Sequence, residues 1–172
     1  MSGPEHPLRV AFCGPGEPGK AERDDAEAIG FALARAGCLV LCGGLGGAME
    51  AVCRGAKRGG GTTIGILPGY DPATANRWVD IPICTGMGHG RNAILVASAD
   101  VVVACGGGWG TLSEIALAVR LGRPIVVQGG WAGAIRAATD GASSISRSAL
   151  IRFTKSPEET AAAALSVVEI QI

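Results

Sequence analysis

Short apolar runs alternate along the chain with longer stretches whose apolar residues recur at helical spacing. The short runs are β-branched and lack polar alternation, which is typical of strands buried on both faces of a sheet. They predict strands over Leu8–Cys13, Cys38–Cys42, Thr63–Leu67, Trp78–Cys84, Asp100–Cys105, Pro124–Gln128 and Ala149–Phe153. The helical spacing predicts helices over Ala21–Ala36, Ala48–Lys57, Arg91–Ser98, Leu112–Leu121 and Pro157–Val168, the last with Ser156 as its N-cap.

This repetition of strand, helix and strand predicts right-handed crossovers within one parallel sheet. The expected fold is α/β, a Rossmann-like doubly wound parallel sheet in a single domain over residues 8–172, after a loose polar tail at residues 1–7. Ligands of such sheets bind beyond the carboxyl ends of the strands. Residues 133–148 are rich in alanine, serine and glycine and fit no clear element.

The charge content of the 172 residues narrows the classes of partner. Charged residues make up 17% of the chain, and 15 basic residues balance 15 acidic ones, so no basic face for nucleic acid is expected. No secretory signal and no apolar run of about 20 residues is seen, which predicts a cytoplasmic protein without a membrane partner. The helix over Arg91–Ser98 is apolar on more than one face, which together with the low charge predicts a homodimer or homotetramer.

The six cysteines form no CxxC pair, so no metal site is expected. Three of them, Cys13, Cys42 and Cys105, each end a predicted strand just before glycines, and parallel strands place these ends at one edge of the sheet. A thiolate or redox role is the alternative, but buried reduced thiols are the favoured interpretation.

The glycine-rich turn after the first predicted strand comes close to a P-loop pattern. Ala21 stands where that pattern has the magnesium-binding hydroxyl, and Pro15 and Pro18 lack the backbone donors that a phosphate would need. The favoured interpretation is therefore a flexible entry into the first helix, with Gly14 at one wall of the ligand site.

Two later glycine turns are better candidates for binding an anion. Glycines let the backbone approach a ligand closely, and the helix that follows each turn begins with free N–H groups. The predicted phosphate ligands are Gly43, Gly44, Gly46 and Gly47 in one turn and Gly106, Gly107, Gly108, Gly110 and Thr111 in the other. The alternative for the first of these turns is a tight turn only.

Thr111 and Glu114 also have the spacing of a capping box, which would give both a purely structural role. In the alternative interpretation, Glu114 faces the cleft and binds ribose hydroxyls or assists cleavage of a glycosidic bond.

A fourth glycine-containing segment, Gly86–Asn92, opens the helix before the central strand. Its Arg91 carries a planar fork suited to phosphate, which places Gly88, Arg91 and Asn92 in the predicted site. The alternative is an ordinary surface arginine, and His89 is expected to be a solvent-exposed loop residue.

The segments Gly43–Gly69 and Thr85–Val127 together resemble the LOG-like superfamily, which contains the LONELY GUY phosphoribohydrolases and the molybdenum-cofactor carrier proteins. The hydrolases show the patterns P-G-G-x-G-T-x-x-E and M-x-x-R-K. In this chain Gly106 stands at the proline of the first pattern, and Gly88 and Asn92 replace the methionine and lysine of the second. The chain therefore resembles the carrier-like branch more closely.

The carrier-like resemblance implies that a homo-oligomer binds a phosphorylated pterin without turnover. No cofactor is then required, and the molybdenum cofactor or a nucleotide is the expected bound ligand. The resemblance to the hydrolases implies an alternative, in which Arg91 and Glu114 are catalytic and a nucleoside 5′-monophosphate is cleaved to base and ribose 5-phosphate. Both hypotheses stay open at the level of sequence.

Overall fold

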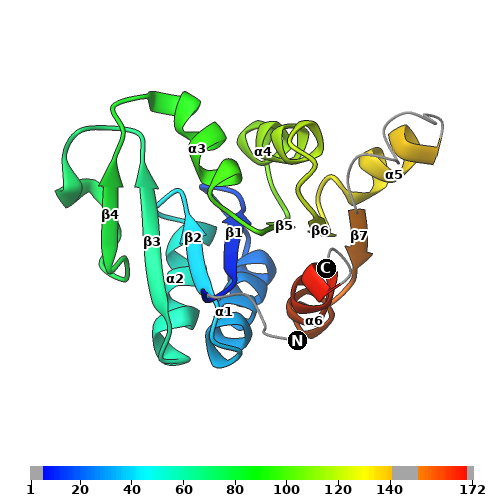
Figure 1. Cartoon of the computed structure of the whole chain (residues 1–172), viewed down its shortest axis with the longest axis horizontal. Coiled ribbons are helices and arrows are strands. Elements are labelled where there is room, and N and C mark those ends of the chain that lie inside the picture. The colour runs from blue at the N-terminus through cyan, green and yellow to red at the C-terminus, as the bar shows by residue number, and fades with distance from the viewer. Residues whose placement is uncertain (1–5, 141–150, 170–172) are drawn as a thin grey trace.

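The computed structural model describes residues 6–140 and 151–169 and contains one seven-stranded parallel sheet in the order β4-β3-β2-β1-β5-β6-β7 (Figure 1). The strands are β1 (Arg9–Cys13), β2 (Leu39–Cys42), β3 (Thr62–Leu67), β4 (Ile81–Cys84), β5 (Val101–Cys105), β6 (Ile125–Gln128) and β7 (Ile151–Thr154). The α-helices are α1 (Lys20–Arg35), α2 (Ala48–Arg58), α3 (Arg91–Ala97), α4 (Trp109–Arg120), α5 (Ala132–Asp140) and α6 (Pro157–Glu169). The predicted doubly wound parallel α/β fold in a single domain is confirmed.

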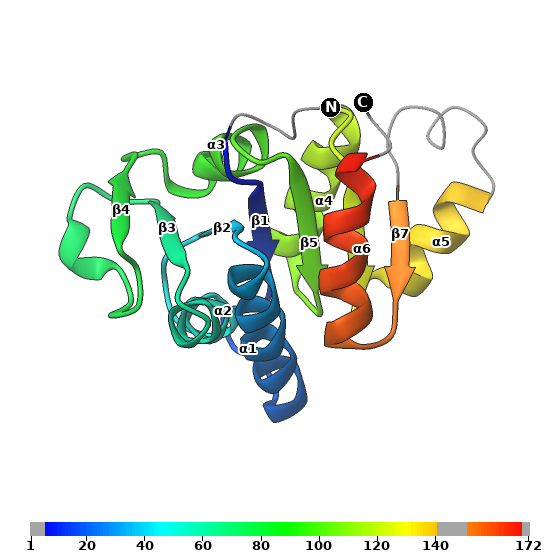
Figure 2. The same cartoon turned by 60° about the horizontal axis from the view of Figure 1, so that its bottom comes forward.

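The helices form a layer on each face of the sheet. Helices α1, α2 and α6 cover one face, and α3, α4 and α5 cover the other (Figures 1 and 2). Successive residues of a strand enter opposite layers: Val10 and Phe12 pack in the first, Ala11 and Cys13 in the second. This explains why the strands read as unbroken apolar runs. No helix in the described part of the chain has the length and apolar character needed to cross a bilayer.

The structure differs from the prediction at the strand expected from Trp78 and in residues 133–148. The strand expected from Trp78 begins only at Ile81, because Asn76 accepts hydrogen bonds from the N–H groups of Trp78 (3.0 Å) and Val79 (3.1 Å) and closes a turn there. The stretch that fitted no element begins with helix α5, and its residues 141–148 lie outside the described residues. The predicted N-cap of α6 is confirmed, since Ser156 Oγ accepts from the Glu159 N–H at 3.2 Å.

Strand β1 lies at the centre of the sheet and pairs with β2 on one side and β5 on the other. The chain winds outward in one direction from β1 to β4 and in the other from β5 to β7. A crevice forms at such a reversal, beyond the carboxyl ends of the two central strands. The turns that follow β1 and β5 therefore border the place where a ligand is expected.

Helices α1 and α2 approach each other at two glycines. A methyl group at Gly30 would overlap the backbone carbonyl of Val52, and one at Gly55 would overlap the carbonyl of Glu27. The two contacts are reciprocal, so neither helix can accept a side chain without moving away from the other. This spacing also sets the position of the first turn of α2, which belongs to the candidate site.

We expect Gly30→Ala to destabilise the protein by about 2 kcal/mol or more, because the new methyl group meets backbone and not a flexible side chain. Gly110→Ala is the matched control, since Gly110 is also helical but has open space around its Cα. The control should be neutral or stabilising by up to about 1 kcal/mol, as alanine favours a helix. Urea unfolding of both variants measures the difference, and equal stabilities would contradict this account of the contact.

Candidate functional site

The turns after β1, β2 and β5 meet at the carboxyl edge of the sheet, with Gly14 between the other two. A methyl group on Gly14 would lie 2.8 Å from Ala48 Cβ and 3.3 Å from the Cys105 carbonyl oxygen. The Ala48 N–H donates to Pro15 O at 3.0 Å, which ties the start of α2 to the turn after β1. The three turns predicted to border a ligand are thus in direct contact, although they come from distant parts of the sequence.

The second turn requires glycine at its last residue. Gly47 has a φ of +71°, and a side chain there would overlap the carbonyl group of Gly16. The backbone of the turn therefore packs directly on the backbone of the first turn.

Arg91, the first residue of α3, is buried at this edge and not on the surface. It is 9% exposed, and its guanidinium lies over Gly43, where any side chain would overlap Nη1 and Nη2. Met49 Sδ lies beside the same glycine. Nη1 is buried and has no hydrogen-bond partner among the residues that the structure describes. A buried donor without a partner is costly, so Nη1 of this guanidinium marks a candidate position for an anion from outside the chain.

Glu114, one turn into α4, lies close to Arg91 and to the Cys13 thiol. Burial raises the pKa of Glu114 to about 6, while a hydrogen bond from Cys13 and the charge of Arg91 act in the opposite direction. Burial and the neighbouring Glu114 carboxylate raise the pKa of Cys13, which keeps this thiol protonated. The site thus contains a permanent cation and a carboxyl group whose charge changes near neutral pH.

Helix α4 begins two residues before Thr111. Its N-cap is Gly108, with no side-chain cap, and the Leu112 N–H donates to Gly108 O at 3.1 Å. The capping-box interpretation of Thr111 and Glu114 is therefore wrong. Thr111 instead packs beneath Gly107, whose φ of +118° is open only to glycine. The N–H groups at the start of α4 remain available to a ligand because no side chain caps them.

Asn92 connects the first turns of α3 and α4. Its Nδ2 donates to Ser113 Oγ at 3.0 Å, and Ser113 Oγ donates to the Gly110 carbonyl at 2.7 Å. The side chain therefore holds the two helices at a fixed distance in addition to bordering the site.

Three of the residues at this edge were not singled out from the sequence. Trp109 is 79% exposed, and its ring lies 5.4 Å from that of Trp131, measured between centroids. Trp131 Nε1 donates to Gly108 O at 3.0 Å, which fixes the turn after β5 to the turn after β6. Met49 is the third. The ring pair could have been predicted from the sequence, because each of two glycine turns contains a tryptophan.

The strand-end cysteines lie at one edge, as predicted. Cys13, Cys42 and Cys105 are all buried and free, which confirms the interpretation as buried thiols. Cys42 Sγ lies 3.4 Å from Cys53 Sγ, and the Gly44 N–H donates to Cys42 Sγ at 3.3 Å. No group of three or more potential metal ligands occurs among the residues described.

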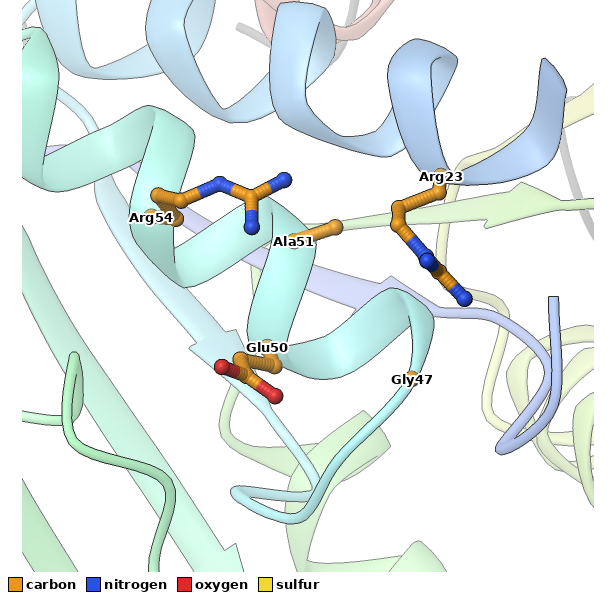
Figure 3. A pocket seen from close by; sticks show the side chains of 5 residues that line it. All are labelled: Arg23, Gly47, Glu50, Ala51 and Arg54. Carbon is orange, nitrogen blue, oxygen red and sulfur yellow. The ribbon is translucent and has the colours of Figure 1, made fainter. Parts of the chain in front are cut away.

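Two hollows flank the carboxyl edge. One, of about 320 Å³, lies between α1 and α2 and is lined by Arg23, Gly47, Glu50, Ala51 and Arg54 (Figure 3). Its charges are mixed, and Arg54 already donates to Glu27 at 2.6 Å, so the hollow lacks the surplus of positive charge that an anion needs. The other, of about 450 Å³, lies at the ends of β6 and β7. Gly47 borders the first hollow, and none of the residues predicted for the site lines the second.

The fold and this edge define a Rossmann-like protein of the LOG-like superfamily, in its carrier-like branch. More narrowly, the chain belongs to the SLOG cluster4 family, whose profile matches residues 7–161. An uncharacterised protein of Archaeoglobus fulgidus is 40% identical over 129 residues, which cover 71% of this chain and 85% of the relative.

Solved structures of similar proteins support the assignment to the carrier-like branch. The molybdenum cofactor binding protein of Rippkaea orientalis is 33% identical, with a TM-score of 0.83, and the match covers 98% of this chain and 99% of the other. The molybdenum cofactor carrier protein of Chlamydomonas reinhardtii is 32% identical, with a TM-score of 0.83 and coverage of 95% and 99%.

Proposed function

We propose that the protein is a carrier-like binding protein that holds a phosphate-bearing small molecule, either a nucleotide or a molybdopterin-type cofactor, without converting it. The observation that carries this proposal is the buried guanidinium of Arg91, whose Nη1 has no partner among the described residues. A phosphate group would accept hydrogen bonds from the planar fork and neutralise its charge. The similarity to molybdenum cofactor carrier proteins supports this kind of ligand.

The glycine turns would supply the remaining phosphate contacts. Gly107, Gly108, Gly110 and Thr111 would present N–H groups at the start of α4, where no side chain caps the helix and the positive end of its 12 residues favours an anion. Gly106, whose own N–H donates to Gln128 O, would border the ligand without donating to it. Gly43, Gly44, Gly46 and Gly47 would contact the ligand from the other side of Gly14, with Gly88 and Asn92 at the edge of the site. No resident cofactor is required for this role.

We expect Arg91→Met to weaken binding of AMP and of the isolated molybdenum cofactor by about tenfold or more, since a charge-assisted hydrogen bond contributes about 1.5–3 kcal/mol. The same substitution should leave the stability of the ligand-free protein nearly unchanged, because it removes a buried guanidinium whose Nη1 lacks a partner, and Glu114 can take up a proton once the cation is gone. Isothermal titration calorimetry measures the affinity, and thermal unfolding measures the stability.

Arg35→Met is the matched control, because Arg35 is exposed at the far end of α1 and its loss removes the same charge. Unchanged affinity in the Arg91→Met variant would contradict the role of the guanidinium. Binding of no phosphate compound by the folded wild-type protein would remove the proposed function itself.

A hydrolase that cleaves a nucleoside 5′-monophosphate is the second candidate, and the raised pKa of Glu114 favours it. A buried carboxyl group with a pKa of about 6 beside Arg91 suits a base that activates water or a carboxylate that stabilises an oxocarbenium-like centre. Water would add at the anomeric carbon, and the bond to the base would break with transfer of a proton to the leaving nitrogen. The departures from the hydrolase patterns at Gly88, Asn92 and Gly106 weigh against this candidate.

Incubation with AMP, followed by chromatography for free adenine, separates the two candidates. The carrier hypothesis expects no adenine. At AMP concentrations well below KM, a hydrolase would release adenine at a rate that rises with pH through about 6 and then levels off, because the carboxylate form of Glu114 in the ligand-free protein predominates only above its pKa. Glu114→Gln should then lower the rate by about 100-fold or more, and release that survives this substitution unchanged would rule out the mechanism.

We also propose that the apolar surface of α3 and α4 pairs with a second copy in a homodimer or homotetramer. Ala93 and Ala97 on α3 and Ala116 on α4 are exposed, and Leu121 just beyond α4 is 49% exposed. Light scattering coupled to gel filtration at micromolar concentration should give a mass two or four times that of the 17.2 kDa chain. A 17.2 kDa particle would contradict pairing, since an interface of about 800 Å² per partner normally persists at that dilution.

The expected cytoplasmic location stays a prediction.

A further inference from the structure

The second hollow, which we name the β6–β7 pocket, lies beside the proposed phosphate site but is not part of it. Its walls come from Asp25 of α1, Gln128 at the end of β6, Arg136 of α5 and residues 153–155 at the end of β7. It measures about 450 Å³, room enough for a fused bicyclic ring.

The β6–β7 pocket adjoins the glycine turn that opens α4. The Gly106 N–H donates to the backbone carbonyl of Gln128 at 2.9 Å, and a methyl group on Gly130 would overlap Gly106 O. A ligand whose phosphate lies on Gly106–Thr111 therefore has its organic part within reach of this pocket.

A buried chain of hydrogen bonds ends on Asp25 at the pocket wall. Gln128 Nε2 donates to Asp25 Oδ2 at 2.6 Å, and Gln128 Oε1 accepts from Thr160 Oγ1 at 2.6 Å. The hydroxyl of Thr154 lies 2.7 Å from that of Thr160 and completes the chain. Gln128 is 5% exposed and Thr160 is fully buried, and turning the amide over would place Oε1 against the acceptor oxygens of the Asp25 carboxylate. The network fixes the orientation of a carboxylate that lines a cavity.

The lining of the pocket contains one carboxylate, Asp25, and two cations, Arg136 and Lys155. Burial and the neighbouring carboxylates Glu158, Asp24 and Glu22 raise the pKa of Asp25, so the surroundings of this carboxylate are negative and favour N–H donors. The Arg136 guanidinium, which also lines the pocket, stacks on the Phe153 ring at 4.2 Å from its centroid, and Lys155 is a further lining residue. The stacked guanidinium offers a flat surface to a ring, and the Lys155 ammonium favours an acceptor.

We propose that the β6–β7 pocket binds the heterocycle of the ligand, and that this ring is a fused 2-amino-4-oxopyrimidine, the ring system shared by guanine nucleotides and pterins. Its ring N–H and 2-amino group are adjacent donors that a carboxylate accepts together, and its carbonyl oxygen, next to them on the same edge of the ring, would accept from the Lys155 ammonium. Adenine lacks this row of groups, and hypoxanthine lacks the amino group. The proposal rests on the proposed phosphate site only for the anchoring of the phosphate.

The test compares GMP, IMP, AMP, ribose 5-phosphate and neopterin monophosphate by calorimetry, with tryptophan fluorescence as a second signal. We expect GMP or neopterin monophosphate to bind about tenfold or more tightly than IMP, as one hydrogen bond to a charged group is lost with the amino group. Whichever of the two binds more tightly identifies the source of the ring. Asp25→Asn should abolish the preference over IMP and leave the affinity for ribose 5-phosphate unchanged.

Asp71→Asn is the matched control, because it removes the same charge from an exposed residue that lies outside the pocket and is not among the carboxylates around Asp25. Equal affinities for GMP, neopterin monophosphate and IMP would overturn the proposal, as would an Asp25→Asn variant that loses ribose 5-phosphate to the same extent. If ribose 5-phosphate does not bind, the proposed phosphate site is wrong. A comparison of guanosine with inosine, which lack the phosphate, then still tests whether the pocket recognises the 2-amino group.

Discussion

The close contact between the Arg91 guanidinium and the backbone of Gly43 is the feature on which the carboxyl edge depends. A guanidinium is almost never buried without a partner, because the loss of hydration is not compensated. Here it lies over a residue that has no side chain, with Nη1 enclosed and unpartnered among the described residues. Any larger residue at this strand end would displace the cation. The arrangement therefore holds a buried cation at the point where three backbone turns meet.

The neighbours of Arg91 set the chemistry that this charge can support. Glu114 is near enough to feel the cation, yet burial keeps its pKa at about 6, and the Cys13 thiol donates to it. An anion bound to Arg91 would raise the pKa of Glu114 further, because two negative charges would then share a buried space. The same cluster can thus hold a phosphate passively or present a carboxylate to a glycosidic bond. Which of these occurs depends on where the ring of the ligand lies relative to Glu114.

Much of the fold was predictable because each strand is buried on both faces. A run such as Val101–Cys105 must pair on both edges, and the alternation with helices leaves a parallel sheet as the simple solution. The positions of the glycine turns and Arg91 at the carboxyl edge of the sheet were predictable on the same ground, as they follow strand ends or begin helices. The start of α4 was not, because the spacing of Thr111 and Glu114 imitates a capping box although the helix begins earlier, at Trp109.

The sequence by itself determined the class of fold and the convergence of three glycine turns at the carboxyl edge of the sheet, where it predicts the ligand site. Those properties follow from local periodicity and from glycine positions, which are readable along the chain. Tertiary structure alone decided that Arg91 is buried, that Glu114 touches Cys13 and that Asp25 reaches Gln128 across 103 positions of sequence. Burial and pairing of this kind depend on which elements become neighbours in the sheet. The sequence pattern of a single helix or strand does not specify which other elements will lie beside it.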